Sequence, residues 1–345
     1  MKIFEDNFFA IASELKIPKE QAAALWNRLG RINKDSETNP FAKYLFYLGA
    51  MIVISAMTWF MNLGWEVFGG GGIFLIASVY ALLFTGLGAI LWKKKQLKVP
   101  SGLLITMAVC MVPLAIYGLQ THYNLWPNDN TGQYSDFYTT VAGKWIYMEL
   151  GTILAGIIAL FFFPFPFITV PIFLSMWFLT MDLVPFIFGR EISPEHKYGL
   201  SMLFGIALIA LGIGLDHKKK GDYGFWSYFF GTLSFWCGLG GLVWGKSEIT
   251  LFIYLIINLM MMVFSIVLKR MVLMIFGCLG VFAYLAHLTY NLFKDSTAFP
   301  FILSLIGLGI IFLGIIYQKN SKRIEKKMLE KLPSSIRNLL PPNRL

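Results

Sequence analysis

Residues 145–188 read WIYMELGTILAGIIALFFFPFPFITVPIFLSMWFLTMDLVPFIF, two apolar runs on either side of the turn Phe163-Pro-Phe-Pro-Phe167. Each run is close to the roughly 20 residues that a helix needs to cross a bilayer. Because proline interrupts a helix, the turn predicts two antiparallel transmembrane helices that lie side by side. This stretch therefore indicates an all-α protein built from membrane-spanning helices.

The same pattern extends over most of the 345-residue chain, which is 57% hydrophobic and only 14% charged. Apolar runs bounded by charges or turn residues predict about ten spans. These are 41–63, 72–92, 101–119, 145–163, 167–188, 199–215, 225–244, 249–268, 271–290 and 299–317. The glycines at 69–72 predict a tight turn between the first two spans. We expect a polytopic bundle over residues 41–317, with polar ends at 1–40 and 318–345.

Lysine and arginine are unevenly divided between the two sides of these spans. Of the 29 basic residues, 24 fall in the two ends and in every second connection, and 5 fall in the remaining connections. Connections rich in Lys and Arg stay in the cytoplasm, so both termini are predicted to be cytoplasmic. The net charge of +10 is thus a topology signal and does not indicate nucleic acid as a partner.

The two ends carry patterns of their own. Residues 3–15 and 18–29 predict two short amphipathic helices, a cytoplasmic hairpin that either packs on its own protein or docks a cytoplasmic protein partner. The tail from Gln318 has eight basic and two acidic side chains, with Ile324, Met328 and Leu329 at helical spacing. It either lies on anionic lipid of the bilayer or is a solvated tail that enforces topology.

Three ionisable residues fall within the predicted spans and are candidates for an ion or proton relay: Glu149, Asp182 and His287. Glu149 lies 16 residues before Phe165 and Asp182 lies 17 after it, so both are roughly 25 Å from the turn. His287 is three residues from the end of its span and should share this layer. The alternative is that these groups reach water and headgroups at the membrane interface.

Other polar and small residues suit contacts between helices. Asn258, with Tyr254 and Ser265 on its face, is predicted to form interhelical polar contacts. Glycine pairs recur in three spans and favour close helix packing: Gly86 and Gly88, Gly212 and Gly214, Gly307 and Gly309. Cys110, Cys237 and Cys278 have no disulfide or metal spacing. No nucleotide, hydrolase or zinc-protease motif is present, so no cofactor, metal or catalytic residue is predicted.

Four short segments carry a family resemblance: AKYL at 42–45, MTWF at 57–60, PLAIYGLQ at 113–120 and WFLTMD at 177–182. Together with the N-terminal hairpin they resemble a family of bacterial multi-pass membrane proteins with a domain of unknown function. The resemblance implies a location in the bacterial inner membrane and gives no information about activity.

Three classes of function stay open at this point. The leading one is translocation of an ion or small molecule through Glu149, Asp182 and His287. The second is a non-catalytic scaffold or envelope sensor that uses the hairpin and the basic tail. The third is an intramembrane enzyme on lipid-linked substrates, which needs a carboxylate and a histidine at one lateral opening.

Overall fold

The computed structural model describes residues 8, 12–15, 17–26, 40–93, 97–125, 145–188, 193–218, 221–292 and 299–331. All regular elements in these ranges are helical, which confirms the predicted all-α class. The long helices are α3 (Pro40–Lys93), α4 (Lys98–His122), α5 (Trp145–Phe162), α6 (Thr169–Phe188), α7 (Pro194–His217), α8 (Gly221–Val243), α9 (Glu248–Leu268), α10 (Met271–His287) and α11 (Phe299–Lys331). Short turns η2 (Pro166–Ile168) and η3 (Leu288–Leu292) precede α6 and follow α10.

Eight helices in the described ranges are long and apolar enough to cross a membrane. The predicted span 41–63 contributes only a shorter apolar segment, Tyr44–Val53, and the predicted span 225–244, in α8, is not among the eight. Each of the ten predicted segments is nevertheless helical over nearly all of its length. The described residues therefore form a bundle with eight apolar helices, and the count of ten membrane spans stays a prediction.

Helix α3 folds back on itself at Gly69, whose φ of 60° and ψ of 176° leave the helical region. Glycine adopts positive φ at no steric cost, which explains the turn that the glycine run predicts. The fold-back also needs glycine for packing, because a Cβ on Gly118 of α4 would lie 2.5 Å from the Phe74 nitrogen. The two arms of α3 meet α4 in one cluster that includes Ala50, Leu103 and Phe84.

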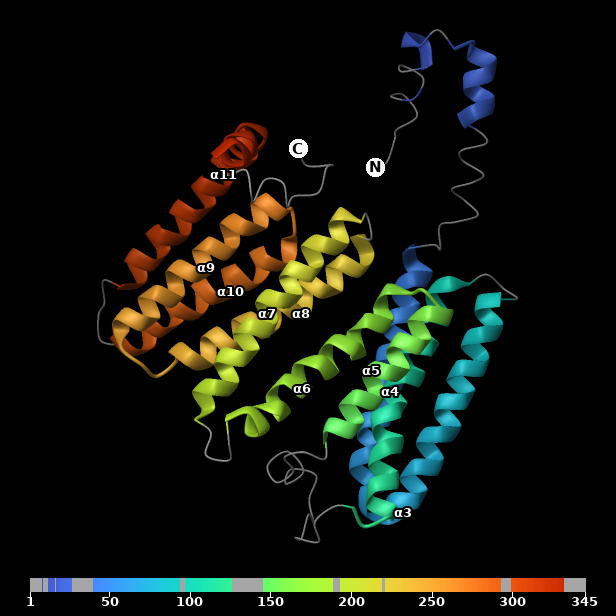
Figure 1. Cartoon of the computed structure of the whole chain (residues 1–345). Helices are drawn as coiled ribbons and strands as arrows, with labels where there is room; N and C mark the ends of the chain where they lie inside the picture. Colours follow the sequence, from blue (N-terminus) through green and yellow to red (C-terminus); the bar gives the residue numbers. More distant parts are fainter. Residues whose placement is uncertain are drawn as a thin grey trace.

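The helices form two groups joined by α6 (Figure 1). Helices α3, α4 and α5 lie on one side, and α7, α8, α9 and α10 lie on the other, with α11 along the edge next to α9. Helix α6 contacts α5 in the first group and α7 in the second. One link is the Trp177 indole, which donates to Ser201 Oγ of α7 at 2.8 Å.

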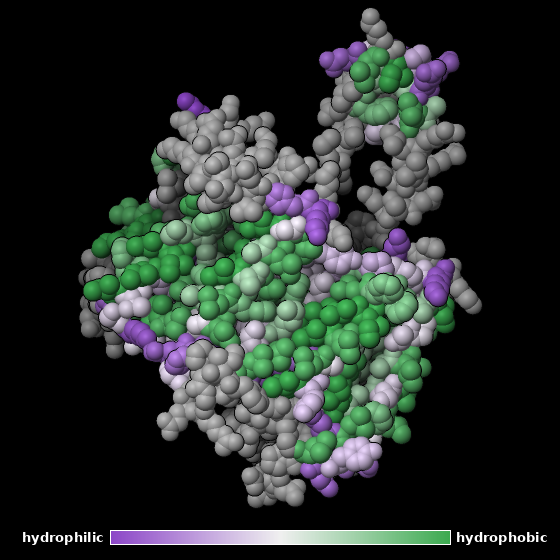
Figure 2. Space-filling view, in the orientation of Figure 1, coloured by the Kyte–Doolittle hydropathy of each residue, from purple (hydrophilic) through white to green (hydrophobic). Residues whose placement is uncertain are grey.

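Charged residues lie at the two ends of the bundle, and apolar residues cover its middle in the visible face (Figure 2). We call the end that carries Lys93, Lys98 and Lys218 the basic end; it is the upper end of the bundle in Figure 1. The start of α3 and the last turn of α11 lie at this same end. The exposed apolar band is what lipid chains would cover.

Small residues and hydroxyl groups hold neighbouring helices close. A Cβ on Gly205 of α7 would lie 2.5 Å from the Gly231 carbonyl oxygen of α8. Ser227 of α8 donates to the Leu208 carbonyl at 2.6 Å, and Ser101 of α4 donates to the Gly88 carbonyl at 2.6 Å. Such contacts substitute for the hydrophobic effect, which does not drive association between helices within lipid.

At the chain ends, the described residues of the predicted hairpin are helical at 12–14 and 19–26. The Phe8 and Trp26 rings lie 5.1 Å apart, and Ala12 and Ala22 are buried. At the other end, α11 continues without a break from the apolar span into the predicted tail, as far as Lys331. Residues 332–345 and the docking and lipid hypotheses for these ends fall outside what the structure describes.

Candidate functional site

The candidate site lies where α5 and α6 run side by side, at the end of the bundle opposite the basic end. Glu149 is in the second turn of α5 and is 6% exposed. Asp182 is in the second half of α6 and is half-buried. The two carboxyl groups are near enough to interact with each other electrostatically. Because two ionised carboxylates repel each other, a proton on one of them stabilises the pair.

The described residues around this pair satisfy its hydrogen-bond acceptors and its charge only in part. Glu149 Oε2 is buried and has no hydrogen-bond partner among the described residues. Lys197, in the first turns of α7, is near enough to Asp182 to act on it electrostatically. The Thr152 hydroxyl, one turn from Glu149, donates to the Met148 carbonyl of its own helix at 2.7 Å. Among the described residues, the pair therefore has Lys197 as a nearby cation, and Glu149 Oε2 is an acceptor without a hydrogen-bond partner.

Packing explains why Glu149 is buried. Its neighbour Met148 packs with Ile73 of α3 and Tyr117 of α4. Gly151 faces α4, because a Cβ there would meet the Ile116 side chain. The predicted antiparallel arrangement of these two spans, set by the turn around Phe165, thus brings the two carboxyl groups to one place.

His287, the third candidate residue, lies apart from this pair. Its Nε2 lies 3.1 Å from Glu248 Oε1, and its ring centre lies 6.2 Å from that of Trp244. Helix α10 packs against α8 and α9, whereas α5 packs against α4 and α6. A shared depth in the membrane therefore did not place His287 beside Glu149 and Asp182.

Asn258 lies fully buried between α9 and α10. Its Nδ2 donates to the Tyr254 carbonyl at 2.8 Å, and its Oδ1 has no partner among the described residues. Gly280 of α10 lies against this amide, where a Cβ would collide with it. Ser265 lies further along α9 and donates to the Arg270 carbonyl at 2.9 Å, which closes the α9–α10 turn.

Sequence reasoning missed a buried ionic group at the basic end. Asp216 of α7 accepts hydrogen bonds from Arg270 of the α9–α10 turn and from the Tyr228 hydroxyl of α8. The Asp216 side chain is 4% exposed and that of Arg270 is 19% exposed. In the sequence, Arg270 is one of the 24 basic residues that indicate topology. The available clue was an aspartate placed directly at the end of an apolar run, among lysines.

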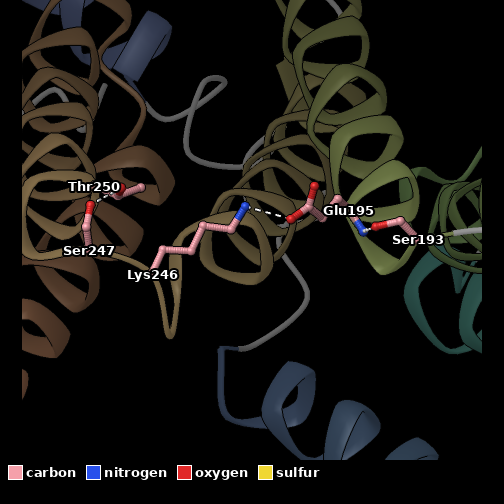
Figure 3. Close-up of polar contacts among 5 residues, drawn as sticks. All are labelled: Ser193, Glu195, Lys246, Ser247 and Thr250. Atoms are coloured by element: carbon pink, nitrogen blue, oxygen red, sulfur yellow. Dashed lines mark hydrogen bonds and ion pairs between the residues drawn. The ribbon is translucent and has the colours of Figure 1, made fainter.

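A further ionic contact lies at the opposite end. Lys246, between α8 and α9, donates to Glu195 of α7 at 2.7 Å, and the two side chains point toward one another (Figure 3). Ser193 caps α7 by accepting from the Glu195 backbone nitrogen. Both Glu195 and Lys246 are exposed, so this pair connects the helix ends at the surface and does not form a buried site.

The fold and these sites define a helical bundle whose eight apolar helices fit a multi-pass membrane protein. Within the described ranges, no three His, Cys, Asp or Glu side chains are grouped to hold a metal ion. No family model, curated protein or solved structure matches the chain.

Proposed function

We propose that the protein translocates a cation, in the simplest case a proton, across the membrane through the Glu149–Asp182 pair. The observation that carries this proposal is a pair of carboxyl groups inside apolar helices. One of them, Glu149, is 6% exposed and has an oxygen without a hydrogen-bond partner in the part of the chain that the structure describes. Ionisable groups at membrane depth are costly and usually mark ion pathways. A carboxyl pair with one proton can release that proton or exchange it for another cation.

The pair is also placed where a translocated ion can act on the fold. Asp182 is on α6, the helix between the two groups of helices, and Lys197 is on α7 of the second group. When the pair loses its proton, the attraction between Asp182 and Lys197 increases. A change of charge at the pair would therefore alter how α6 and α7 are held together.

The test is ion flux into liposomes that contain the purified full-length protein. A pH-sensitive dye reports protons, and Na⁺ or K⁺ gradients test the other cations. We expect Glu149→Gln and Asp182→Asn to abolish flux while thermal unfolding shows that both variants fold. Glu195→Gln is the matched control, because Glu195 is an exposed carboxylate at the same end of the bundle. Undiminished flux in both site variants would refute the proposal.

We further propose that the protein lies in the bacterial inner membrane, with the basic end in the cytoplasm. The support is the bias of 24 against 5 basic residues between the two sides of the predicted spans. A fluorescent-protein fusion after Leu345 should be fluorescent, because the fluorophore matures in the cytoplasm. An alkaline phosphatase fusion at the same position should be inactive, and the opposite pair of results would reverse the orientation.

A non-catalytic scaffold is the second candidate, and α11 favours it. In the apolar segment Pro300–Asn320, none of the described side chains is fully buried by the rest of the chain. Such a helix can bind a helix of another protein within the membrane. A scaffold predicts that deletion of residues 299–345 removes function in the cell while cation flux is absent in the intact protein. Flux that depends on Glu149 would exclude a purely structural role.

A further inference from the structure

A polar cluster lies between α8, α9 and α10, separate from both buried ionic groups. Tyr254 and Asn258, one turn apart on α9, are 1% and 0% exposed. The Asn258 amide and the Trp236 indole of α8 are both near enough to the Tyr254 hydroxyl to interact with it. Asn258 is the central residue of α9, so the cluster lies halfway along this helix. We call Trp236, Tyr254 and Asn258 the central polar cluster.

Two buried atoms of this cluster have no hydrogen-bond partner among the described residues, Trp236 Nε1 and Asn258 Oδ1. The indole nitrogen can only donate, and the amide oxygen can only accept. Asn258 Nδ2 donates to the Tyr254 carbonyl of its own helix at 2.8 Å, which fixes the orientation of the amide. The cluster therefore holds one unmatched donor and one unmatched acceptor, and each costs free energy in an apolar surrounding.

A third buried atom without a partner lies on the same face of α8. Thr232 is 0% exposed, lies one turn before Trp236, and its Oγ1 has no partner in the described part of the chain. This face also carries Leu239, which packs with Tyr254 of α9. In α4, by contrast, the Thr106 hydroxyl donates to the carbonyl one turn earlier at 2.8 Å. Polar atoms without partners thus gather where α8 meets α9.

The central polar cluster lies where two closely packed helix pairs meet. In the α7–α8 pair, a Cβ on Gly231 would lie 2.9 Å from the Gly205 carbonyl oxygen. In the α9–α10 pair, a Cβ on Gly277 would lie 2.9 Å from the Asn258 carbonyl oxygen. Between the pairs, α8 meets α10 through side chains, with the Trp236 and Phe276 rings 5.9 Å apart. A junction made by side chains, unlike a direct backbone contact, can enclose a small polar ligand.

We propose that the central polar cluster binds a water molecule that joins the two helix pairs. The water accepts a hydrogen bond from Trp236 Nε1, donates one to Asn258 Oδ1, and makes a third with the Tyr254 hydroxyl. Buried waters typically make about three hydrogen bonds to groups that are otherwise unmatched. A cation does not fit, because an indole N–H only donates and the cluster has no negative charge. Water is the smallest ligand that both donates and accepts.

The test is contact between water and the Trp236 indole in the full-length protein, with isotope-labelled tryptophan, in lipid bilayers. Water-edited NMR transfers magnetisation from water to nearby indole N–H groups, and Trp236→Phe identifies the Trp236 signal. We expect this signal to appear as early as that of Trp244, which is 52% exposed. Trp177 is the reference without bound water, because its indole donates to Ser201 Oγ at 2.8 Å. A Trp236 signal as late as that of Trp177 would overturn the proposal.

Two variants assign the water to this cluster. Tyr254→Phe removes one of the three partners, and we expect water to bind about fivefold more weakly, the factor that one hydrogen bond contributes. The double variant Tyr254→Phe with Asn258→Leu leaves Trp236 as the one polar partner in the cluster, and its contact with water should be lost. The matched control is Tyr284→Phe, because Tyr284 packs in the same apolar cluster as Tyr254.

The control should keep the native Trp236 signal. A native signal in the double variant, or an equal loss in Tyr284→Phe and Tyr254→Phe, would show that other groups hold the water and would overturn the proposal. Neither readout depends on ion flux, so the result stands apart from the proposed translocation.

Discussion

Removing Arg270 should destabilise the protein far more than removing an exposed partner of similar geometry. In Arg270→Met, the Asp216 carboxylate stays 4% exposed and loses both hydrogen bonds from the guanidinium. Hydrogen bonds to charged groups contribute about 1.5–3 kcal/mol each, and a buried pair that loses one partner typically costs about 3–5 kcal/mol. The remaining bond from Tyr228 keeps the expected loss within that range, and we expect about 3–5 kcal/mol.

The double variant Asp216→Leu with Arg270→Met tests whether the loss comes from the uncompensated charge. Neutral, apolar replacement of both partners is often close to energetically neutral, so we expect the double variant to lose less than about 1–2 kcal/mol. The free energy of unfolding is measured by detergent-induced unfolding in mixed micelles, followed by tryptophan fluorescence. Lys246→Met, which breaks the exposed pair with Glu195, is the control and should leave stability unchanged.

Two results would refute this reasoning. Additive losses in the double variant would show that the two side chains contribute independently, through packing and not through their pairing. A loss below about 1 kcal/mol in Arg270→Met would show that Asp216 is hydrated or protonated without difficulty once the guanidinium is absent.

Two glycine substitutions test the close contacts between helices. Gly280→Ala places a methyl group against the buried Asn258 amide, and we expect a loss of about 1–3 kcal/mol in unfolding free energy. Asn258→Ala should relieve that clash. The double variant Gly280→Ala with Asn258→Ala should therefore lose less unfolding free energy than the two single variants together. A loss equal to the sum of the single losses would contradict the contact. Gly102→Ala places a methyl group into the Phe165 ring and should lower the melting temperature, whereas Gly86→Ala meets nothing within 4 Å and should not. An equal fall in melting temperature in Gly102→Ala and Gly86→Ala would show that packing against a neighbouring side chain is not the cause.

The carboxyl pair was partly predictable because its two helices are neighbours in sequence. The turn around Phe165 fixed both which helices pair and how far each carboxyl group lies from the turn. For His287, the sequence predicts a depth along its helix but not which helices lie beside it, because no short connection links α10 to α5 or α6. Its depth in the membrane stays a prediction from hydropathy, and its neighbour Glu248 could not be predicted in this way.

The glycine pairs also show that the sequence of a span does not tell which helix it packs against. Gly88 lies against Ile105, and Gly212 lies against the Tyr228 ring, as close helix contacts predict. Gly307 and Gly309 of α11 carry the same pattern, yet nothing lies within 4 Å of a Cβ at either position. A pattern of small residues shows that a helix can approach another closely. Which helix it meets depends on the rest of the fold, and the sequence of the span itself does not contain that information.

The two buried ionic groups differ in a way that assigns them different roles. In the Asp216–Arg270 group, a carboxylate faces a guanidinium, and a guanidinium does not give up its proton in proteins. Its charges are balanced within the group, so it is suited to hold three helices in place. In the Glu149–Asp182 group, two carboxyl groups interact, and Glu149 Oε2 has no partner within the described ranges. Two ionised carboxylates at this distance repel each other, which is why the proposed cation translocation is assigned to this pair and not to the Asp216–Arg270 group.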